Sequence, residues 1–458
     1  MARMPHFAAE EGSRRPTSAT LSGMEDRANF YDEAVETIDR DKLHGLQEQK
    51  LADLIDTIWG RNRFYTAKLK AAGFELGDRK LLDHLGRLPF TTKAELMAAQ
   101  AEGGLLSTNC TFPEEAYTRI HQTSGTTGEP LRVYDTAASW DWWSRCWGFV
   151  LSGAGLSAGD RLFLPFSFGP FIGFWAAVGG ADKIGALLIS GGGRDSRQRL
   201  DLITRFQTSA MCCTPTYALR LAEVAREAGI DPAGLPLRRT IHAGEPGASV
   251  LATKARIEQA LGVRCYDHAG ASEVGAHSFE CEPQPGSIHV IESEFIVEVL
   301  EPGGDRPVIP GQQGELVLTN LGRAGFPVIR YRTGDAVQVD PAPCPCGRTL
   351  VRLAGGIVGR VDDMLVIRGV NVFPSAIDEL VRSTAGIDEY RVTVTSRRHM
   401  GHLVIEVECT DGFDSATASS QLIQAFGRAL SLQPEVVPVA RGTLPRFELK
   451  ARRFFVQA

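Results

Sequence analysis

The sequence contains few cysteines, no excess of charge of one sign and no long apolar run. Nine cysteines in 458 residues are too few for a disulfide scaffold. The 49 basic and 55 acidic residues give a formal net charge of -6, which provides no overall field for nucleic acid or for an anionic membrane. The longest apolar runs, such as residues 171–181, are well short of the ~20 residues that cross a bilayer. We therefore expect a cytoplasmic protein with a small-molecule partner, and neither nucleic acid nor membrane as a partner.

The first 28 residues differ from the rest of the chain. They are polar and mixed in charge, and they lack the apolar stretch of a secretory signal, so we expect a flexible tail over residues 1–28. The chain as a whole has 43% hydrophobic residues and exceeds the roughly 250–300 residues at which one core stops growing. Two or more domains are therefore expected.

Apolar periodicity predicts an α/β fold class. Residues 41–74 place apolar side chains at helical spacing, which predicts a long amphipathic helix followed by a shorter one. From about 160 to 270, apolar runs alternate with helical stretches, which is typical of a parallel sheet with crossover helices. Short strands with Gly-Gly and Pro-Gly turns from about 288 to 340 predict an attached β meander or barrel. The stretch from about 363 onward is long enough for a small α+β domain.

The segment HQTSGTTGEP, residues 121–130, concentrates hydroxyl groups and glycines. Its candidate phosphate-binding residues are Thr123, Ser124, Gly125, Thr126, Thr127 and Gly128. Hydroxyls and the exposed N–H groups of glycines can surround phosphate oxygens without a side-chain clash. The segment is not a Walker loop, because Glu129 and not a lysine follows Gly128. Taken alone, it is equally compatible with an ordinary polar loop.

Four charged residues at the ends of loops support the phosphate interpretation. They are Glu273 in YDHAGASEVG, Asp335 in YRTGD, Arg360 in GRVDD and Lys450 in GTLPRFELKARRFF. In this order and at these spacings, they and the loop resemble the adenylate-forming superfamily of acyl-CoA synthetases, luciferases and peptide-synthetase adenylation domains. Segments 214–232, 328–335 and 362–380 are similar to signatures of the phenylacetate–CoA ligase group. The likeness runs from about residue 30 to the C-terminus.

The resemblance implies a two-step reaction at one site. A carboxylic acid attacks the α-phosphate of ATP to give an acyl-adenylate and pyrophosphate, and the thiol of CoA then displaces AMP. Glu273 matches the family's magnesium carboxylate, a role that suits a hard cation with oxygen ligands. Asp335 matches the acid that binds the ribose hydroxyls, with Arg360 as a second nucleotide contact. Lys450 matches the catalytic lysine that bridges the carboxylate and the α-phosphate oxygens.

Each of these roles has a structural alternative that the sequence leaves open. Glu273 could cap a nearby helix, and Asp335 could be a turn-forming residue after Gly334. Lys450 could be a solvated surface residue beside two arginines.

The resemblance also implies contacts for the adenine and for the acid. The nucleotide contacts would include Gly244, Glu245, Pro246 and Asp267. The candidate acid-pocket residues are Phe168, Phe171, Tyr217, Ala243, Ala269 and Gly270. The aromatic, glycine-interrupted segment 166–175 suits a flat apolar ligand, so an aryl or arylalkyl carboxylate is expected. Ordinary core packing is at least as good an account of Phe166 and Trp175.

Two departures from the family pattern qualify this expectation. Glu129 stands where the phenylacetate ligases carry a lysine, so an acid would lie near a polyanion. Ala269 stands where an aromatic residue usually precedes the glycine, which leaves a smaller wall and room for a bulkier or polar acyl group.

The resemblance further implies a domain movement. The large adenylation domain would comprise residues 29–361, and a small lid domain, residues 362–458, would rotate about Asp362 between the two half-reactions. Gly369 would then face the CoA pantetheine tunnel, or it is simply a strand-ending glycine. The resemblance also suggests a homodimer.

Three cysteines and a histidine form a candidate metal set outside these motifs. His277, Cys281, Cys344 and Cys346 would make the Cys₃His set of a closed structural zinc site. The C-x-C spacing is tighter than the usual C-x₂-C, so ordinary thiols in a turn are the alternative. His289 or Cys265 could replace His277 as the fourth ligand.

Three functions compete on this basis. The first is an ATP-dependent aryl-acid–CoA ligase. The second is an adenylating enzyme that passes the activated group to a carrier protein, an amine or another acceptor. The third is a non-catalytic nucleotide-binding relative, and the joint presence of Glu273, Asp335, Arg360 and Lys450 argues against it.

Overall fold

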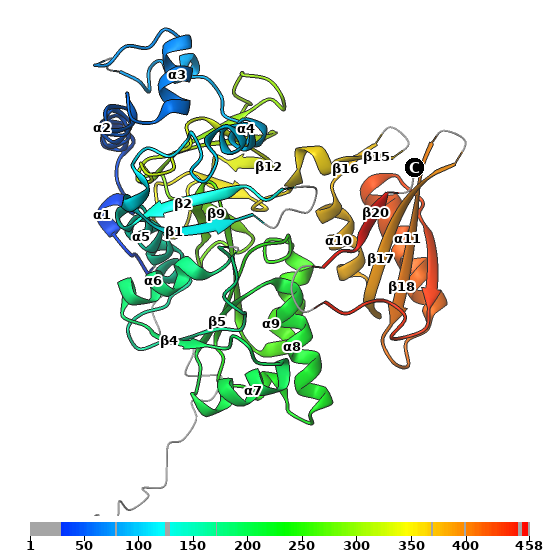
Figure 1. Ribbon diagram of the computed structural model, residues 1–458. Helices are drawn as coiled ribbons and strands as arrows, with labels where there is room; N and C mark the ends of the chain where they lie inside the picture. Colours follow the sequence, from blue (N-terminus) through cyan, green and yellow to red (C-terminus); the bar gives the residue numbers. More distant parts are fainter. Residues whose placement is uncertain are drawn as a thin grey trace, which may run out of the picture.

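The computed structural model of the protein describes residues 29–456, except 78–79, 124–128, 171, 368–369, 398–399 and 448–450 (Figure 1). The predicted tail, residues 1–28, lies outside the described residues. So do eight of the candidate site residues, namely Ser124, Gly125, Thr126, Thr127, Gly128, Phe171, Gly369 and Lys450. None of the described helices combines the length and the apolarity that a membrane crossing requires.

Helices form the N-terminal region, drawn in blue in Figure 1. They are α1 (Glu33–Glu36), α2 (Arg40–Ile58), α3 (Arg63–Ala71) and α4 (Lys93–Gly103), with 3-10 turns η2 (Leu85–Arg87) and η3 (Glu114–Ala116). The long and the shorter helix predicted for residues 41–74 are α2 and α3. Asp39 caps α2 by accepting a hydrogen bond from the Lys42 N–H at 2.9 Å. The apolar face of α2 is buried through residues such as Leu51 and Ile58.

A hairpin and a buried helix connect this region to the main sheet. Strands β1 (Tyr117–Gln122) and β2 (Arg132–Thr136) pair antiparallel, and helix α5 (Ala137–Gly153) follows directly. Helix α5 contacts both α6 (Trp175–Ile184) and β8 (Gly275–Glu280). Its sequence is apolar nearly all round, and most of its residues are buried, as expected for a helix inside a large domain.

One continuous sheet organises the large domain. Its strands run in the order β10-β11-β12-β13-β9-β8-β7-β6-β5-β3-β4, with β14 beside β12. The parallel part contains β3 (Arg161–Leu164), β4 (Leu187–Ser190), β5 (Ala210–Cys213), β6 (Arg239–His242) and β7 (Arg264–Ala271). The connecting segments contain α6, α7 (Ser196–Arg205), α8 (Pro215–Glu227), η4 (Pro232–Gly234) and α9 (Leu251–Leu261). The strand–helix alternation predicted for residues 160 to 270 is confirmed.

The predicted meander continues this sheet. Its strands are β8, β9 (Ser287–Val290), β10 (Phe295–Leu300), β11 (Gln313–Asn320), β12 (Tyr331–Asp340), β13 (Arg352–Ala354) and β14 (Gly359–Arg360), followed by η5 (Val361–Asp363). Strand β8 pairs antiparallel with β7, and β13 pairs with both β9 and β12. The turn after β7 and the start of β12 therefore belong to one framework.

The C-terminal residues form a smaller α+β unit with its own core, drawn in orange and red in Figure 1. It contains β15 (Leu365–Ile367), β16 (Val370–Val372), α10 (Pro374–Ser383), β17 (Ile387–Arg397), β18 (Met400–Cys409), α11 (Ser415–Leu430), β19 (Glu435–Val439) and β20 (Phe454–Val456). Its larger sheet has the order β19-β18-β17-β20. The α/β fold class with a small C-terminal α+β domain is confirmed, and the boundary at residue 362 stays a prediction.

Candidate active site

Glu273 lies in the tight turn between β7 and β8, and its side chain is buried. The hydroxyl of Tyr331, the first residue of β12, donates a 2.7 Å hydrogen bond to Glu273 Oε1. The turn is held by the Arg323 guanidinium, which donates to the Ser272 carbonyl at 2.7 Å, and by the Asn320 amide, which donates to the Val274 carbonyl at 3.0 Å. Glu273 therefore caps no helix and is presented by a turn that is fixed on both sides.

A buried ion pair ties this turn to the β1–β2 hairpin. Arg323 and Asp135 are both 0% exposed in their side chains. Their two hydrogen bonds, at 2.8 and 2.7 Å, form a bidentate pair. Asp135 lies on β2, and Arg323 also contacts Ser272 beside Glu273. Because one guanidinium binds both elements, the hairpin and the Glu273 turn keep a fixed relation.

The hairpin carries the ends of the predicted phosphate loop. The Thr123 N–H donates to the Leu131 carbonyl at 2.9 Å, and the Leu131 N–H donates to the Thr123 hydroxyl at 3.1 Å. The structure thus closes the hairpin at the residue that precedes the segment 124–128. Glu129 follows this segment and is exposed, and its carboxylate accepts a 3.2 Å hydrogen bond from the Gln100 amide on α4. This contact accounts for the acid that the sequence pattern left unexplained.

Asp335 and Arg360 face each other across β12 and β14. They are paired in the strand register. Arg360 Nη1 donates to the Thr333 carbonyl at 2.6 Å and lies 3.3 Å from Asp335 Oδ1. Burial raises the pKa of Asp335 to about 6, although the Arg360 charge opposes the shift. Gly334 has a φ of +73°, and a Cβ atom there would lie 2.6 Å from Arg360 Nη2. A glycine is therefore required between Thr333 and Asp335.

The segment after β6 contains three of the predicted nucleotide contacts. Gly244 and Pro246 are exposed, whereas Glu245 is partly buried and turned inward. Glu245 Oε1 accepts from the Thr216 N–H at 2.8 Å, and Glu245 Oε2 accepts from the Ala451 N–H at 2.8 Å. The carboxylate is thus shared between α8 and the C-terminal unit.

Asp267 on β7 is also engaged within the protein. Its carboxylate accepts a hydrogen bond from the Ser249 hydroxyl, and its N–H donates to Glu280 at 2.6 Å. Burial raises its pKa. Asp267 therefore already has a hydroxyl partner at its carboxylate.

Aromatic residues cluster beside the hydrophobic core that contains Ala269. The ring centroid of Phe168 lies 4.5 Å from that of Trp175 and 4.8 Å from that of Phe166. Ala243 and Phe168 pack against the core that includes Ala269. The neighbouring Gly270 is exposed, and a Cβ atom there would lie 2.9 Å from the Gly275 carbonyl oxygen. Four of the expected pocket residues thus lie on or beside β6 and β7 or against the same core.

Tyr217 does not join this cluster. It is 2% exposed within a second core formed by α7 and α8, and its hydroxyl bonds to Arg199 at 2.9 Å and Ser196 at 3.1 Å. Tyr217 follows Pro215 in the first turn of α8, so its ring points into the helix packing. As a pocket residue, Tyr217 is not supported by this placement.

His121 is a candidate site residue that the sequence analysis did not identify. It is the last residue but one of β1, two residues before Thr123, and is 6% exposed. Its ring stacks on Trp140 at 5.3 Å and lies 6.0 Å from Trp175. Its Nδ1 atom is buried and has no partner among the described residues. The stacking of His121 could not be predicted from the sequence, because Trp140 and Trp175 lie far from it along the chain.

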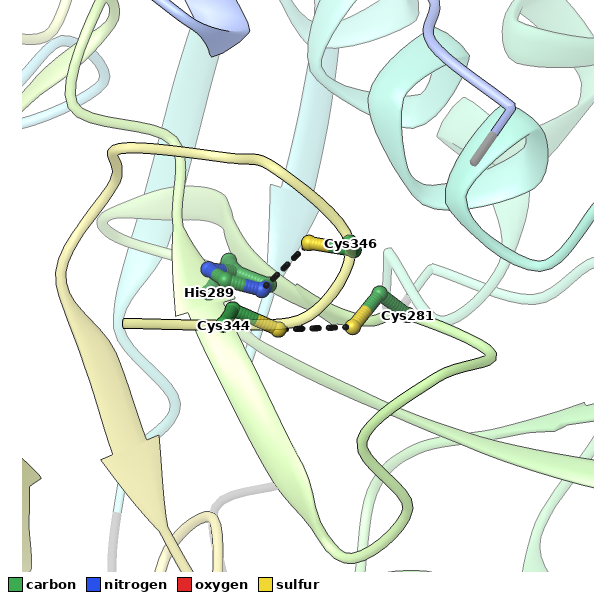
Figure 2. Close-up of side chains that lie close together, drawn as sticks. All are labelled: Cys281, His289, Cys344 and Cys346. Carbon is green, nitrogen blue, oxygen red and sulfur yellow. Dashed lines mark hydrogen bonds between the residues drawn. The ribbon is translucent and has the colours of Figure 1, made fainter. Parts of the chain in front are cut away.

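The cysteine cluster is real, but its histidine is His289 and not His277 (Figure 2). The Sγ atoms of Cys281 and Cys344 are 3.5 Å apart, and the Cys346 Sγ is 3.5 Å from His289 Nε2. All four ligand atoms lie within 4.8 Å of one another. Strand β9 carries His289 and runs beside β13, so the loop before β13 brings Cys344 and Cys346 to it. His277 instead bonds to Ser278 at 2.7 Å.

The cluster and the Glu273 turn lie at opposite ends of β8. Glu273 precedes this strand and Cys281 follows it. Eight residues of extended chain at about 3.3 Å each separate the two by roughly 20 Å or more. Cys265, the other alternative ligand, packs in the second core.

The predicted hinge residue lies at the junction of the two domains. Asp362 is exposed in the 3-10 turn η5, and its carboxylate accepts from Arg360 Nε at 3.2 Å. This contact links Asp362, which lies between β14 and β15, to the side chain that faces Asp335.

The chain matches two known protein families. Residues 81–323 match the family described as "AMP-binding enzyme", and residues 369–457 match "AMP-binding enzyme C-terminal domain". The phenylacetate-coenzyme A ligase of Thermus thermophilus is 32% identical over 414 residues, covering 89% of this chain and 91% of the relative. The phenylacetate-coenzyme A ligase of Escherichia coli is 32% identical and covers 92% of this chain and 96% of the relative.

Solved structures also match over nearly the full length. A 2-hydroxyisobutyryl-CoA ligase in its postadenylation state has a TM-score of 0.88 at 28% identity, covering 98% of this chain and 95% of that chain. The same enzyme in its thioesterification state has a TM-score of 0.71 over the same shares of the chains, 98% and 95%. The domain arrangement described above is therefore closer to the postadenylation state of that ligase. The chain belongs to the AMP-binding, adenylate-forming enzymes, and within them it is an AMP-forming acid–thiol ligase similar to the phenylacetate-coenzyme A ligases.

Proposed function

We propose that the protein activates an aryl or arylacetic-type carboxylic acid with ATP and transfers the acyl group from the acyl-adenylate to CoA. Pyrophosphate leaves in the first step and AMP in the second. The observation that carries this proposal is the convergence of Glu273 and Asp335 on one strand, β12, where Tyr331 contacts the first and Arg360 faces the second. The four relatives named phenylacetate-coenzyme A ligase support the substrate class.

Glu273 would hold Mg²⁺. Tyr331 occupies Oε1, and Glu273 Oε2 has no partner among the described residues. A single carboxylate oxygen together with substrate phosphates is the kind of ligand set that Mg²⁺ uses. Its chemistry would be to neutralise the charge of the triphosphate. The residues Thr123 to Gly128 would surround the triphosphate beside it.

Asp335 would bind the ribose hydroxyls, and Arg360 would hold Asp335 in place while it makes a second nucleotide contact. Gly244 and Pro246 would lie along the adenine. The backbone is suited to this role because Gly244 has a φ of +95° and is exposed. Lys450 would bridge the substrate carboxylate and the α-phosphate in the adenylation step.

The acid pocket would be walled by Phe168, Ala243, Ala269 and Gly270, with Phe171 beside them. Phe168 supplies a ring edge that is already fixed against Trp175 at 4.5 Å. Ala269 has a small side chain at this wall. We propose that the acyl group is flat and carries a substituent, so that it is larger than an unsubstituted arylacetate.

A panel of carboxylic acids tests the function. Pyrophosphate release is followed with and without CoA, and the thioester is measured in parallel. We expect release only with aromatic acids, and thioester formation when CoA is present. Lys450→Ala should lose adenylation while still binding ATP. Release without a thioester would favour a carrier protein, an amine or another acceptor, and no release with any acid would contradict the proposal.

We also propose a structural zinc ion in the cluster of Cys281, His289, Cys344 and Cys346. In a tetrahedral site with Zn–S bonds of about 2.3 Å, ligand atoms lie roughly 3.8 Å apart. The two shortest contacts here are both 3.5 Å. Three buried thiols and one imidazole, without an open position, fit zinc better than Mg²⁺ or Ca²⁺. The ion would join the end of β8 and strand β9 to the loop before β13.

Metal content tests the zinc proposal. Wild-type protein purified without chelator should contain one zinc per chain. Cys344→Ser should lose it, whereas Cys409→Ser, which changes a thiol of the small domain, should retain it. A metal-free wild type would end the proposal. Retention of zinc by His277→Gln and its loss in His289→Gln would establish the fourth ligand.

The lid movement is a further part of the proposal. We propose that residues 29–361 form the adenylation domain and residues 362–458 the lid. Asp362 would act as the hinge between the half-reactions. The exposed position of Asp362 in a short turn suits a residue that must change its backbone angles. Gly369 would then line the CoA tunnel.

A further inference from the structure

The segment that follows Lys450 in the sequence touches both domains. Residues Phe454–Val456 form β20, which pairs with β17 inside the lid. Three residues earlier, the Ala451 N–H donates to Glu245 Oε2 of the adenylation domain at 2.8 Å. Arg453 Nη1 lies 3.4 Å from the Thr216 hydroxyl of the adenylation domain. The backbone next to Lys450 is thus tied to the large domain through one carboxylate.

Both oxygens of the Glu245 carboxylate accept hydrogen bonds, one from each domain. Glu245 Oε1 accepts from the Thr216 N–H at 2.8 Å, in the first turn of α8, where free N–H groups and the helix dipole favour an anion. This partner belongs to the same domain as Glu245. The Ala451 N–H belongs to the lid, so that bond exists only while the lid has the orientation seen here.

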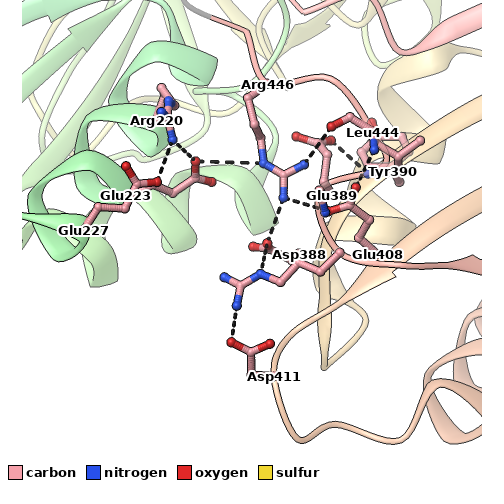
Figure 3. Close-up of polar contacts among 12 residues, drawn as sticks. Arg220, Glu223, Glu227, Asp388, Glu389, Tyr390, Glu408, Asp411, Leu444 and Arg446 are labelled. Atoms are coloured by element: carbon pink, nitrogen blue, oxygen red, sulfur yellow. Dashed lines mark hydrogen bonds and ion pairs between the residues drawn. The ribbon is translucent and has the colours of Figure 1, made fainter.

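Arg446 and Arg453, which lie on either side of residues 448–450 in the sequence, are both bonded within the lid. Arg453 makes a bidentate pair with Glu389 of β17, at 2.6 and 2.8 Å. On the other side, Arg446 bonds to Glu408 at 2.8 Å and to Asp388 at 3.3 Å, as Figure 3 shows. Arg446 and Arg453 therefore both belong to the lid.

Across the interface, Arg446 has a weaker link than the Glu245–Ala451 bond. Its Nε atom lies 4.0 Å from Glu223 of α8, which is paired with Arg220 at 3.1 Å (Figure 3). Figure 3 also shows Glu227 on the same helix, paired with Arg220 and without a bond to the lid. Glu245 thus provides the shortest link between the adenylation domain and the Lys450 segment among the described residues.

We propose that Glu245 is a positioning residue that holds the segment after Lys450 in place for adenylation and releases it when the lid rotates. This inference rests on the proposed function, because Lys450 is given its role there. The bond belongs to the arrangement that matches a postadenylation state at a TM-score of 0.88 and a thioesterification state at 0.71. Glu245 would therefore serve one half-reaction and be dispensable in the other.

A direct adenine contact makes a different prediction for the same residue. If the Glu245 carboxylate bound the nucleotide, its loss would raise the KM for ATP. If Glu245 acts on the lid, its loss lowers the rate of adenylation and leaves the KM for ATP unchanged. The two occupied oxygens favour the second account, because no lone oxygen is turned toward a ligand.

Glu245→Gln is the matched substitution. The glutamine has the same shape, but its NH₂ group would face one of the two N–H donors, so it can serve only one of them. Loss of a hydrogen bond to a charged acceptor corresponds to roughly tenfold to a hundredfold. We expect acid-dependent pyrophosphate–ATP exchange to fall by that factor. Thioester formation from supplied acyl-adenylate and CoA should be unchanged. Glu227→Gln is the control and should leave both half-reactions at the wild-type rate.

A double substitution identifies the route of the effect. In a Lys450→Ala background, Glu245→Gln should cause no further loss of the residual adenylation rate, because its only effect is through that lysine. Equal slowing of both half-reactions by Glu245→Gln, a raised KM for ATP or an additive loss in the double variant would overturn the proposal.

A structural readout separates this inference from the proposed function. Spin labels at Leu187 and Asp411, both exposed and on different domains, report the distance between the domains in the full chain. Glu245→Gln should broaden the distance distribution relative to wild type and to Glu227→Gln. An unchanged distribution would refute the lid contact even if the enzyme adenylates acids. A changed one would support the contact even if every tested acid fails.

Discussion

The carboxylates of Glu273 and Glu245 are held by different parts of the molecule. Glu273 receives its hydrogen bond from Tyr331, and its turn is fixed by Arg323 and Asn320, all within the adenylation domain. Glu245 takes one of its two bonds from the lid, through Ala451. Under the proposed function, the group that meets the nucleotide in both half-reactions is supported by the core. The group needed for adenylation alone is supported by a contact with the lid.

The contacts that hold Glu273 and Glu245 also differ in the free energy that it costs to break them. The Arg323–Asp135 pair behind the Glu273 turn is 0% exposed on both sides. Breaking one half of such a pair leaves a charge in the protein interior, which is costly. The interface bonds join side chains and backbone of two domains, and under the proposed lid movement their loss exposes each partner to solvent. We therefore expect core variants to change the free energy of unfolding and interface variants to change the rates of half-reactions.

The largest effect is expected for Arg323→Met. This change leaves the Asp135 carboxylate buried without its partner and should lower the free energy of unfolding by about 3–5 kcal/mol. The Ser272 carbonyl also loses its donor, so magnesium-dependent activity should fall with stability. Urea unfolding followed by fluorescence of the buried tryptophans measures the first effect.

Two companion variants sharpen the result for Arg323. The double variant Arg323→Met with Asp135→Leu should recover most of the lost stability, because no unpaired charge is left. Arg63→Ala removes one partner of an exposed pair, with side chains 72% and 64% exposed. It should cost less than about 1 kcal/mol. A loss below that value for Arg323→Met would contradict the distinction between core and interface.

The second prediction concerns the pH dependence of ATP binding through Asp335. Burial raises the pKa of Asp335 to about 6, so the carboxyl group is ionised above that pH and protonated below it. The ionised form is the stronger acceptor for ribose hydroxyls. We therefore expect the KM for ATP to rise as the pH falls through about 6. Asp335→Asn should raise the KM at pH 8 by roughly tenfold and abolish this pH dependence.

The raised pKa of Asp335 also affects the stability of the fold, and this effect depends on pH in the opposite direction. A carboxyl group whose pKa is raised on folding contributes stability at low pH, and this contribution is lost as the pH rises from about 4 through about 6. Asp335→Asn should therefore be no less stable than wild type at pH 8. Asp340→Asn, at the other end of β12, is the control and should keep the pH-dependent KM. A pH-dependent KM in Asp335→Asn would contradict the assignment.

The sequence predicted the framework of the site but not all of its contacts. Apolar runs and helix periodicity gave β3 to β7, α8, α2 and α3, because burial on both faces and amphipathic spacing are local properties of the sequence. The Thr123 loop was singled out by its hydroxyls and glycines, and Glu273, Asp335 and Arg360 were singled out as charged residues at the ends of loops. The register of β12 with β14, which sets Asp335 against Arg360, depends on pairing between distant residues and left no local signal.

The errors have the same origin. His277 was the choice nearest to Cys281 in sequence, whereas His289 is brought to the cluster by the pairing of β9 with β13. Tyr217 was expected at the acid pocket, but the start of α8 turns its ring into the second core. The contact of Glu245 with the lid could not be predicted from residues 242–246, because its partner Ala451 is 206 residues away.

The third prediction tests the interface at a different place. Helix α9 begins after Val250 without a side-chain cap of its own. Its Ala252 N–H instead donates to Glu379 of the lid at 2.9 Å, and the Thr253 hydroxyl donates to Asp378 of the lid at 2.9 Å. Glu379→Ala removes a cap worth about 1 kcal/mol, which corresponds to roughly fivefold. We expect adenylation to slow by up to that factor, with the free energy of unfolding lowered by no more than about 1 kcal/mol.

Measurement of both half-reactions checks this prediction. Asp411→Asn alters a lid carboxylate that is 83% exposed and pairs with Arg441 inside the lid, so it should change neither half-reaction. If Glu379→Ala lowers the stability of the whole chain by several kcal/mol, the interface is part of the core and the comparison drawn above is wrong.

The smallest effect is expected for Glu129, the acid that stands beside the predicted triphosphate loop. Its carboxylate is exposed and bonds to Gln100, which also holds the Pro130 carbonyl and the Arg132 N–H. Glu129→Gln keeps this bond and removes only a charge that faces solvent and is screened by salt. The KM for ATP should change by less than about twofold at 0.15 M salt. A fall of tenfold or more would mean that Glu129 repels the triphosphate directly. In that case the hairpin would hold an acid against the ligand, and Gln100 would serve to restrain it rather than to support the loop.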